Sequence, residues 1–310
     1  MITEHATEWL GFPVRLFAPE EAGEKPVDWS RTIFRLALDW DATMDFTELF
    51  AAFLEQPGVE QTPAIVIGKF FAESPEDTAE EVVESLVTAR ECLPALRGIF
   101  LGDLVSEECE VSWINQTDVS PLFTAYPGLE HLRLRGTNRL SLGRRPRHAR
   151  LRSLTIETGG LPPALLGEVL AGDFPALETL ELWLGTPSYG GDVTLLDLQS
   201  LLSGKLFPRL RHLGLRDSEL ADALAAGLAG APILEQLEGL DLSLGNLGDA
   251  GGAALLANPA LRRLQRLNLR HHYLSPRVAR ALQQALPFVD VAEAQDSQTP
   301  EEDRYVAVGE

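Results

Sequence analysis

The sequence predicts an α/β solenoid: a horseshoe-shaped stack of strand–turn–helix units, with parallel strands on the concave face and mostly helices on the convex face. An apolar pattern, Leu-x-x-Leu-x-Leu, fills residues 237–242 and returns 27 residues later at residues 264–269. Similar strand patterns occur about ten times, and most are separated by a run with helical apolar spacing. Because one such unit cannot bury its own apolar side, neighbouring units must stack on it.

The strand patterns follow one another at intervals that average about 28 residues. Side chains alternate across a strand, so the fourth and sixth positions of each pattern should enter the core. A helical return between successive strands makes those strands parallel. The patterns begin at Ile33, Thr62, Leu96, Leu129, Leu151, Leu177, Leu210, Leu237, Leu264 and Leu286.

Helical returns are predicted between most of these strands. Apolar residues recur at i, i+3 and i+4 in residues 46–53, 82–87, 165–169, 195–202 and 220–228. A further helix is expected to start at Ser275-Pro276, because serine caps a helix and proline fits its first turn. In the short repeat before residue 151, Gly143-Arg144-Arg145-Pro146-Arg147 takes the place of a helix.

The chain is divided into three parts on this pattern. Residues 1–31 fit no repeat and are expected to form an N-terminal cap, because a solenoid needs its first apolar layer covered. Residues 32–291 form the solenoid. Residues 292–310 begin with a polar, acidic stretch to residue 303, so we expect a mobile tail. The alternative is that residues 305–308, which alternate weakly, dock on the final repeat.

The spacing and helical returns resemble leucine-rich repeats of the ribonuclease-inhibitor-like type over about residues 33–291. The whole chain is also similar to an uncharacterised family of bacterial cytoplasmic leucine-rich repeat proteins. That similarity rests on Ser112-Trp113-Ile114 and on residues 181–185 and 271–274. It implies an interaction scaffold, or an accessory subunit that holds an enzyme encoded in the same operon.

Composition limits the function classes. The net charge of −20 argues against general affinity for nucleic acid or anionic membranes, because phosphate binding depends on clustered cations. Two cysteines, Cys92 and Cys109, form no disulfide framework, and no basic, apolar leader opens the chain, so we expect a cytoplasmic protein. No nucleophile elbow, phosphate loop or Cys-x-x-Cys pair occurs; we therefore expect neither an enzyme nor a cofactor.

The concave face should carry the third, fifth and seventh residues of each strand pattern. Its first third is small and apolar, and we expect a cap or loop to cover it. From Arg133 onward the concave face is charged, which favours recognition of a protein partner there. We expect the protein to be a monomer. The expected partner-binding residues are Arg133, Arg135, Glu157, Glu181, Trp183, Arg216, Asp241, Arg270 and His271.

Trp183 is the central residue of this prediction. Tryptophan and arginine dominate the energetics of protein interfaces, so an outward Trp183 beside Arg216 would be a binding hot spot. The alternative is that residues 186–192 fold back and bury the indole, because tryptophan is usually largely buried.

An arginine-rich segment departs from the acidity of the chain. Eight arginines and no acidic residue lie between His131 and Glu157. Five of them are candidates to bind an anion or nucleic acid: Arg139, Arg144, Arg145, Arg147 and Arg150. The alternative is that they pair with the carboxylates of the protein itself, and the lack of interleaved aromatics weakens the nucleic-acid interpretation.

Two histidines follow the strand at residues 264–269. His271 is expected at the edge of the concave face, whereas His272 should turn inward and hydrogen-bond carbonyl groups of the turns. Adjacent strand residues point to opposite sides, so this pair predicts no metal site.

Overall fold

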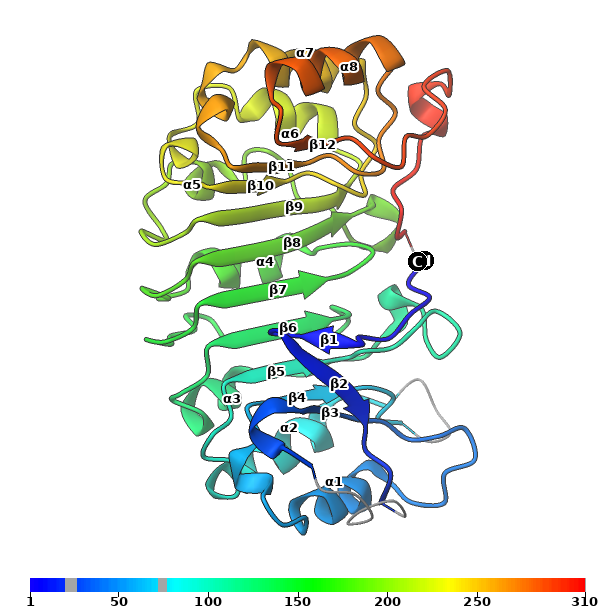
Figure 1. Ribbon diagram of the computed structural model, residues 1–310, viewed down its shortest axis with the longest axis vertical. Coiled ribbons are helices and arrows are strands. Elements are labelled where there is room, and N and C mark those ends of the chain that lie inside the picture. The colour runs from blue at the N-terminus through cyan, green and yellow to red at the C-terminus, as the bar shows by residue number, and fades with distance from the viewer. Residues whose placement is uncertain (20–26, 72–76, 310) are drawn as a thin grey trace.

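The chain forms one sheet of twelve strands whose spatial order is their order in the sequence (Figure 1). The computed structural model describes residues 1–19, 27–71 and 77–309. All neighbouring strands are parallel except the first two, which pair antiparallel. The sheet is open rather than closed into a barrel, and its repeated units fit a leucine-rich-repeat-like solenoid.

The ten predicted strands correspond to β3–β12. The strands are β1 (Glu8–Trp9), β2 (Phe12–Leu16), β3 (Ile33–Leu36), β4 (Ala64–Ile67), β5 (Gly98–Leu101), β6 (His131–Arg135), β7 (Ser153–Glu157), β8 (Thr179–Gly185), β9 (His212–Ser218), β10 (Gly239–Asp241), β11 (Arg266–Asn268) and β12 (Val289–Asp290).

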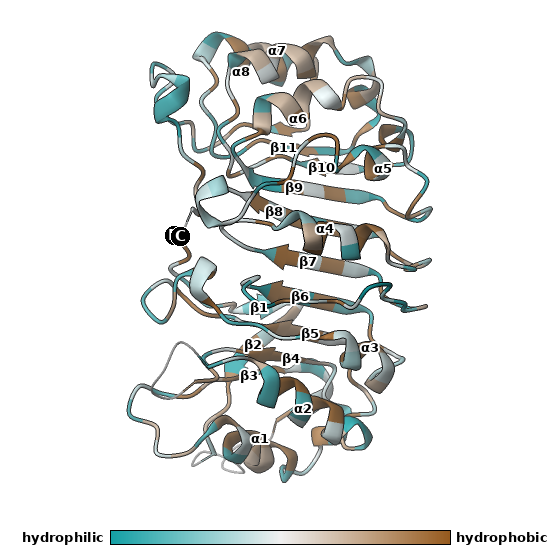
Figure 2. Cartoon of the chain, turned by 180° about the vertical axis from the view of Figure 1, so that it is seen from behind, coloured by the Kyte–Doolittle hydropathy of each residue, from teal (hydrophilic) through white to brown (hydrophobic). Residues whose placement is uncertain are grey.

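The helices lie in one layer on one side of this sheet (Figure 2). They are α1 (Phe46–Leu54), α2 (Glu80–Thr88), α3 (Ser120–Ala125), α4 (Pro163–Leu170), α5 (Gln199–Leu202), α6 (Ala221–Gly227), α7 (Asp249–Ala257) and α8 (Pro276–Ala285). No helix forms between β6 and β7, as the arginine-rich sequence there predicted. Among the described residues, no helix is long and apolar enough to cross a bilayer.

Local capping signals fix where two of the helices begin. Asp45 accepts a hydrogen bond from the Glu48 backbone N–H at 2.9 Å, and Glu48 accepts one from the Asp45 N–H at 3.1 Å, a reciprocal capping box for α1. Hydrogen bonds from Thr47 and from the Glu48 N–H lower the pKa of Asp45. At α8, the Ser275 hydroxyl accepts from the Val278 N–H, and Pro276 occupies the first turn as predicted.

The leucines at the fourth and sixth strand positions form a continuous core between sheet and helices. Leu213, Leu240 and Leu267 lie side by side in consecutive strands and are at most 1% exposed. The predicted register is therefore confirmed here, because a shift of one residue would place these leucines on the other face.

The two ends of the chain do not continue the strand–turn–helix pattern. Strands β1 and β2 form a hairpin, and β2 adds to the sheet beside β3. At the other end, most of residues 292–303 are exposed, whereas Val306 and Val308 near the end of the segment are buried. Alternating apolar residues in this short segment provide side chains to bury, although the residues before them are acidic.

The register makes a stability prediction at Leu240. Replacing this 1% exposed side chain with alanine should lower the free energy of unfolding by about 2–5 kcal/mol, because the substitution leaves a cavity in the core. Chemical denaturation measures the change. Leu196→Ala is the control, since Leu196 is 71% exposed and should change stability by less than about 0.5 kcal/mol. Equal losses in both variants would contradict the assigned register.

Candidate functional site

The sheet face opposite the helices, here called the strand face, carries most of the predicted partner-binding residues. The strand register aligns the fifth positions Thr155, Glu181, Gly214, Asp241 and Asn268 in one row. Trp183 and Arg216 are likewise direct neighbours in the next row. The sequence thus assigned these rows correctly.

The first third of the strand face is covered, as predicted, by the N-terminal hairpin. Ala64, Val66 and Phe100 are fully buried, and Trp9 and Leu10 pack against them. The rings of Trp9 and Phe100 are 6.0 Å apart. Figure 1 shows β1 and β2 crossing in front of the strands at this end. This part of the face is therefore unavailable to a partner.

A buried chain of ion pairs continues from this cover into the middle of the sheet. Asp103, fully buried, binds Arg35 at 2.9 Å and Arg135 at 3.5 Å. Arg135 in turn binds Glu157 at 2.7 Å, and Arg133 binds the other oxygen of Glu157. Burial opposes ionisation of Glu157, but Arg133 and Arg135 together lower the pKa of its carboxyl.

This network corrects two of the predicted contact residues. Arg135 and Glu157 are 4% and 1% exposed, so they bind each other rather than a partner. Arg133 remains partly exposed while its guanidinium lies 4.3 Å above the Phe100 ring. The chemistry of this region is structural, because its charges are paired below the surface.

Trp183 is also buried, and the exposed hot spot predicted there is wrong. The indole is 6% exposed and clusters with Val111, Val308, Ile2 and Ala307. The apolar cover thus includes Ile2 and residues 307–308 from the two ends of the chain, together with Val111 from the middle of the chain. The Nε1 of Trp183 donates to Glu181 at 2.9 Å, and the guanidinium of Arg216 lies 5.3 Å from the centre of the indole ring.

The two chain ends contact each other at the edge where the strands end. The Met1 amino group donates to the Ala307 carbonyl at 2.8 Å, and the Ala307 N–H donates to Leu244. Figure 1 shows both termini at the same place beside the sheet. The Val308 N–H donates to Asp217 at 2.9 Å, and burial raises the pKa of Asp217 to about 8. Its second oxygen has no hydrogen-bond partner among the described residues.

The open part of the strand face lies over β8–β11. A pocket of about 290 Å³, here called the strand-face pocket, is lined by Thr179, Glu181, His212, Leu213, Gly214, Gly239, Leu240, Asp241 and Arg266. Gly214 and Gly239 leave room in its floor. His212 and Arg266 are exposed at the start of their strands.

A fixed arginine borders this pocket. Arg216 binds Glu181 at 2.7 Å, Asp241 at 3.6 Å and the Ser243 hydroxyl at 3.0 Å. Asp241 also accepts from Asn268 at 2.8 Å. Burial alone would lower the pKa of Arg216, but the neighbouring carboxylates raise it, so the cation is held in place.

Of the last two predicted contact residues, Arg270 is partly exposed and His271 is buried. Arg270 pairs with Asp290 and Glu293. His271 is buried, a correction to its expected place at the rim, because Tyr305 of the C-terminal segment packs 5.9 Å from its ring. His272 is 1% exposed; its ring bonds the Val291 carbonyl at 2.9 Å and the Leu274 N–H at 3.1 Å, which confirms the inward prediction.

The arginine-rich segment is exposed between β6 and β7. Arg139, Arg144, Arg145, Arg147 and Arg150 are all exposed, and within the described parts of the chain none of them forms an ion pair. Arg152, at the end of the same arginine-rich stretch, does form ion pairs, with Glu178 at 2.8 Å and Glu130 at 3.8 Å. The expectation that the segment pairs with the protein's own carboxylates is wrong for these five.

Sequence analysis missed Asp103, Asp217 and the chain ends, because all three depend on contacts between segments far apart in the chain. His212 and Arg266 occupy the third strand position and were identifiable from the register alone. Among the described residues, no group of three or more His, Cys, Asp or Glu is placed to hold a metal ion.

Burial of Trp183 predicts a structural effect of its removal. Trp183→Ala should lower the free energy of unfolding by about 3–5 kcal/mol, as for other buried aromatic truncations. Thermal and chemical denaturation measure it. Trp113→Ala is the matched control because Trp113 is 59% exposed. An unchanged melting temperature for Trp183→Ala would instead support an indole ring that is exposed to solvent.

The raised pKa of Asp217 predicts a pH dependence. The folded state binds this proton more tightly than the unfolded chain, whose aspartate pKa is about 3.9, so stability should fall as pH rises from about 4 to about 8. Asp217→Asn keeps the acceptor for Val308 and removes the titration. Across this pH window the unfolding free energy of Asp217→Asn should fall less steeply than that of wild type. The difference between the two slopes should be up to about 1.4 kcal/mol per pH unit.

The control for this measurement is Asp192→Asn, at an exposed site. Curves of stability against pH that run parallel for wild type and Asp217→Asn would contradict the assignment.

Comparison with known proteins identifies a relative. A crystal structure of a Bacteroides fragilis protein superposes on this chain with a TM-score of 0.81 and 32% sequence identity, covering 88% of this chain and 76% of that one. An internalin from Listeria monocytogenes gives a TM-score of 0.32 and 13% identity over 86% and 74% of the two chains, values too low to support an argument. No family model matches the chain, and no curated protein does. The identity and coverage show that this chain belongs to the same family as the Bacteroides fragilis protein.

Proposed function

We propose that this chain is a ribonuclease-inhibitor-like leucine-rich repeat scaffold that binds a protein partner through the open part of its strand face. One observation carries the proposal: between the covered N-terminal third and β12, the strand face keeps a pocket with exposed polar side chains. We place the contacts at Arg133, Glu181, His212, Arg216, Asp241, Arg266 and Arg270.

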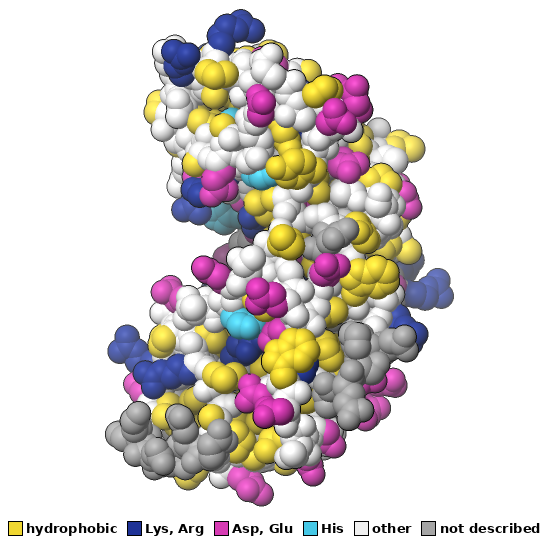
Figure 3. Space-filling model, turned by 90° about the vertical axis from the view of Figure 1, so that its right-hand side faces the viewer, with side chains coloured by type: hydrophobic (Ala, Val, Ile, Leu, Met, Phe, Trp, Pro, Cys, Tyr) yellow, Lys and Arg dark blue, Asp and Glu magenta, His cyan; other side chains and the backbone are white. Residues whose placement is uncertain are grey.

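The shape of the molecule supports this placement. Figure 3 views the edge that carries the chain ends, and the outline is indented on its left, the side of the strand face. Charged side chains of both signs border the indentation. A concave surface of this kind, formed by a curved solenoid, is what repeat proteins use for binding.

The electrostatics favour a partner with charges of both signs. Arg216 is held between Glu181 and Asp241 before any partner arrives, so little side-chain entropy is lost on binding. Arg266, exposed and without an ion pair among the described residues, offers a cation to an acidic group of the partner. Fixed charges of this type select a partner more than they add raw affinity.

The same proposal carries further assignments. We propose residues 1–31 as an N-terminal cap, 32–291 as the solenoid and 292–310 as a C-terminal segment that docks on it. The protein acts as a cytoplasmic monomer without chemistry of its own, and a catalytic partner would make it an accessory subunit of an enzyme.

A second candidate function rests on a separate observation. Five exposed arginines between β6 and β7 have no ion pair among the described residues, in a chain of net charge −20. This surface favours binding of an anion, or of single-stranded nucleic acid by backbone contacts alone, since no aromatic side chain is interleaved to stack bases.

Charge reversal on the strand face tests the scaffold function. Wild-type protein should capture a specific partner from its host. Arg266→Glu should abolish this capture or weaken it about tenfold or more, because glutamate would repel the acidic group of the partner that Arg266 attracts. The measurement is affinity capture with quantitative mass spectrometry, followed by titration of the purified partner. Arg280→Glu, the same change on the exposed helix side, is the control and should bind like wild type.

Loss of capture in both variants would indicate a non-specific charge effect. Equal capture by both variants would place the interface elsewhere than the strand face.

The second candidate has its own test. Oligonucleotide binding to the full chain should fall steeply with salt if the arginines release counterions, and should disappear when Arg139, Arg144 and Arg145 are all changed to glutamine. No binding at low ionic strength would dismiss nucleic acid as a ligand.

A further inference from the structure

A second cavity lies at the opposite edge of the sheet, where the strands begin. Its volume is about 510 Å³, and three consecutive repeats form it. The first contributes residues 90–97, which lead into β5; the second contributes residues 125–128, which lead into β6; the third contributes Arg150, ahead of β7. We call it the arginine cavity. It is separate from the strand-face pocket, with which it shares no residue.

All charged side chains that line this cavity are arginines: Arg90, Arg97 and Arg150. Arg90 has one ion pair, with the exposed Glu91 at 3.5 Å. Over the described ranges, Arg97 and Arg150 form no ion pair. A cavity lined by arginines without carboxylates is unexpected in a chain with 46 acidic and 26 basic residues, and it favours an anionic ligand.

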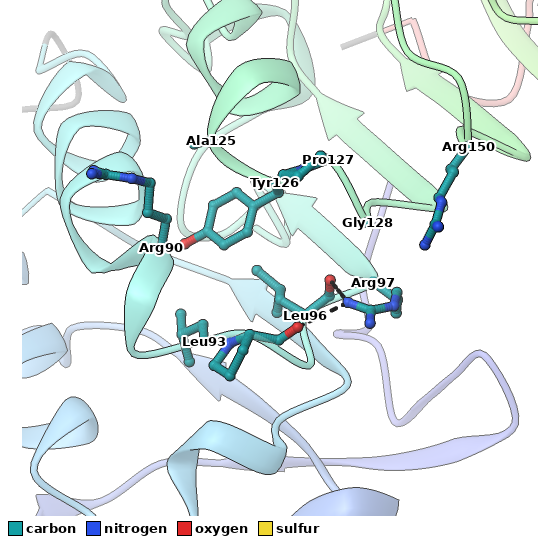
Figure 4. A pocket seen from close by; sticks show the side chains of 10 residues that line it. Arg90, Leu93, Leu96, Arg97, Ala125, Tyr126, Pro127, Gly128 and Arg150 are labelled. Atoms are coloured by element: carbon teal, nitrogen blue, oxygen red, sulfur yellow. Dashed lines mark hydrogen bonds between the residues drawn. The ribbon is translucent and has the colours of Figure 1, made fainter.

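Backbone contacts hold one of these guanidinium groups at the cavity wall. Arg97 donates to the carbonyls of Pro94 at 3.1 Å and Leu96 at 2.8 Å (Figure 4). It also passes over Gly128, where an added Cβ would lie 2.8 Å from its Nη1. A residue with a side chain at position 128 would displace the guanidinium. The glycine therefore allows the arginine to adopt this position.

The three arginines approach the cavity from different sides. In Figure 4 the Arg150 side chain points toward Arg97, whereas Arg90 lies across the cavity with its guanidinium directed away. Arg97 and Arg150 both line the cavity, and we infer that they can bind one ligand group together. Planar guanidinium groups match the oxygens of phosphate in pairs of hydrogen bonds, so a phosphoryl group is the ligand that suits two of them.

The rest of the cavity wall is apolar and fixed. Pro94 and Pro127 are exposed and offer an apolar surface to a ligand. Leu93 and Tyr126 are buried, and the Tyr126 hydroxyl donates to the Leu86 carbonyl at 2.5 Å, which holds its ring in place. Volumes of about 300–1,000 Å³ are typical of small-molecule sites and exceed the need of an inorganic ion. The ligand should therefore carry an organic group as well as the phosphate.

We propose that the arginine cavity binds a small phosphate monoester, with the phosphoryl group on Arg97 and Arg150 and the organic group against Pro94 and Pro127. The proposal does not depend on the strand-face partner. It shares Arg150 with the second candidate function and gives that residue a defined cavity and a small ligand in place of a nucleic-acid strand.

Calorimetric titration of the full chain with phenyl phosphate tests the proposal, with inorganic phosphate, phenol and single-stranded DNA as comparison ligands. Phenyl phosphate should bind at one saturable site, more tightly than inorganic phosphate, with affinity that falls as salt is added. Phenol, which lacks the dianion, should not bind.

Three variants assign the site. Arg150→Gln should weaken phenyl phosphate binding about tenfold or more, because it removes charge-assisted hydrogen bonds. Gly128→Ala should also weaken it while leaving the net charge unchanged, since the new methyl group displaces Arg97. Arg280→Gln, an equal charge change at an exposed position on α8, should bind like wild type. Melting temperatures within a few degrees of wild type confirm that the variants are folded.

Absence of saturable phenyl phosphate binding at low ionic strength would overturn the proposal. So would an Arg150→Gln variant that binds as tightly as Arg280→Gln. DNA binding that is lost only in the Arg139, Arg144 and Arg145 triple variant, with no phenyl phosphate site, would support the second candidate function and overturn the cavity assignment.

Discussion

The alternation of side chains across a sheet in constant register is the constraint on which this structure depends. Leu213, Leu240 and Leu267 fill equivalent core positions in consecutive strands, and Glu181 and Asp241 project from equivalent positions on the other face. A one-residue shift in any repeat would exchange these sets and bury charge without a partner. The core therefore also determines which residues are offered for binding.

The strand face is limited by the chain's own ends rather than by its repeats alone. The N-terminal hairpin covers the apolar residues at one end, and Ile2, Ala307 and Val308 contribute to the cover of Trp183 at the strand ends. Asp103 joins the N-terminal segment to the sheet, since it accepts from the Ala6 N–H and binds Arg35 and Arg135. Burying such charges is costly, and the paired geometry offsets that cost. What remains open is the mixed-charge surface over β8–β11.

Much of the fold was predictable because its signals are local. The leucine period, the Ser275-Pro276 helix start and the missing helix before β7 all depend on residues close in sequence. The site was less predictable. The register placed Arg216 and Asp241 correctly, but the burial of Trp183 and His271 depends on Val308 and Tyr305, more than thirty residues away in sequence. Such contacts leave no periodic pattern in the chain, and a short apolar segment after an acidic stretch looks mobile when its docking surface is unknown.

The hydrogen bond between residues 1 and 307 has a consequence for folding. Contacts between neighbouring repeats are local in sequence, so folding can start within any repeat and spread along the stack. The ends differ, because their docking surface of Trp183, Asp217 and Leu244 exists only after β8, β9 and the following repeat have assembled. Closure by the termini should then be the last folding event, and their release the first step of unfolding. The native state of this chain therefore depends on contacts between its two ends that no single repeat can form.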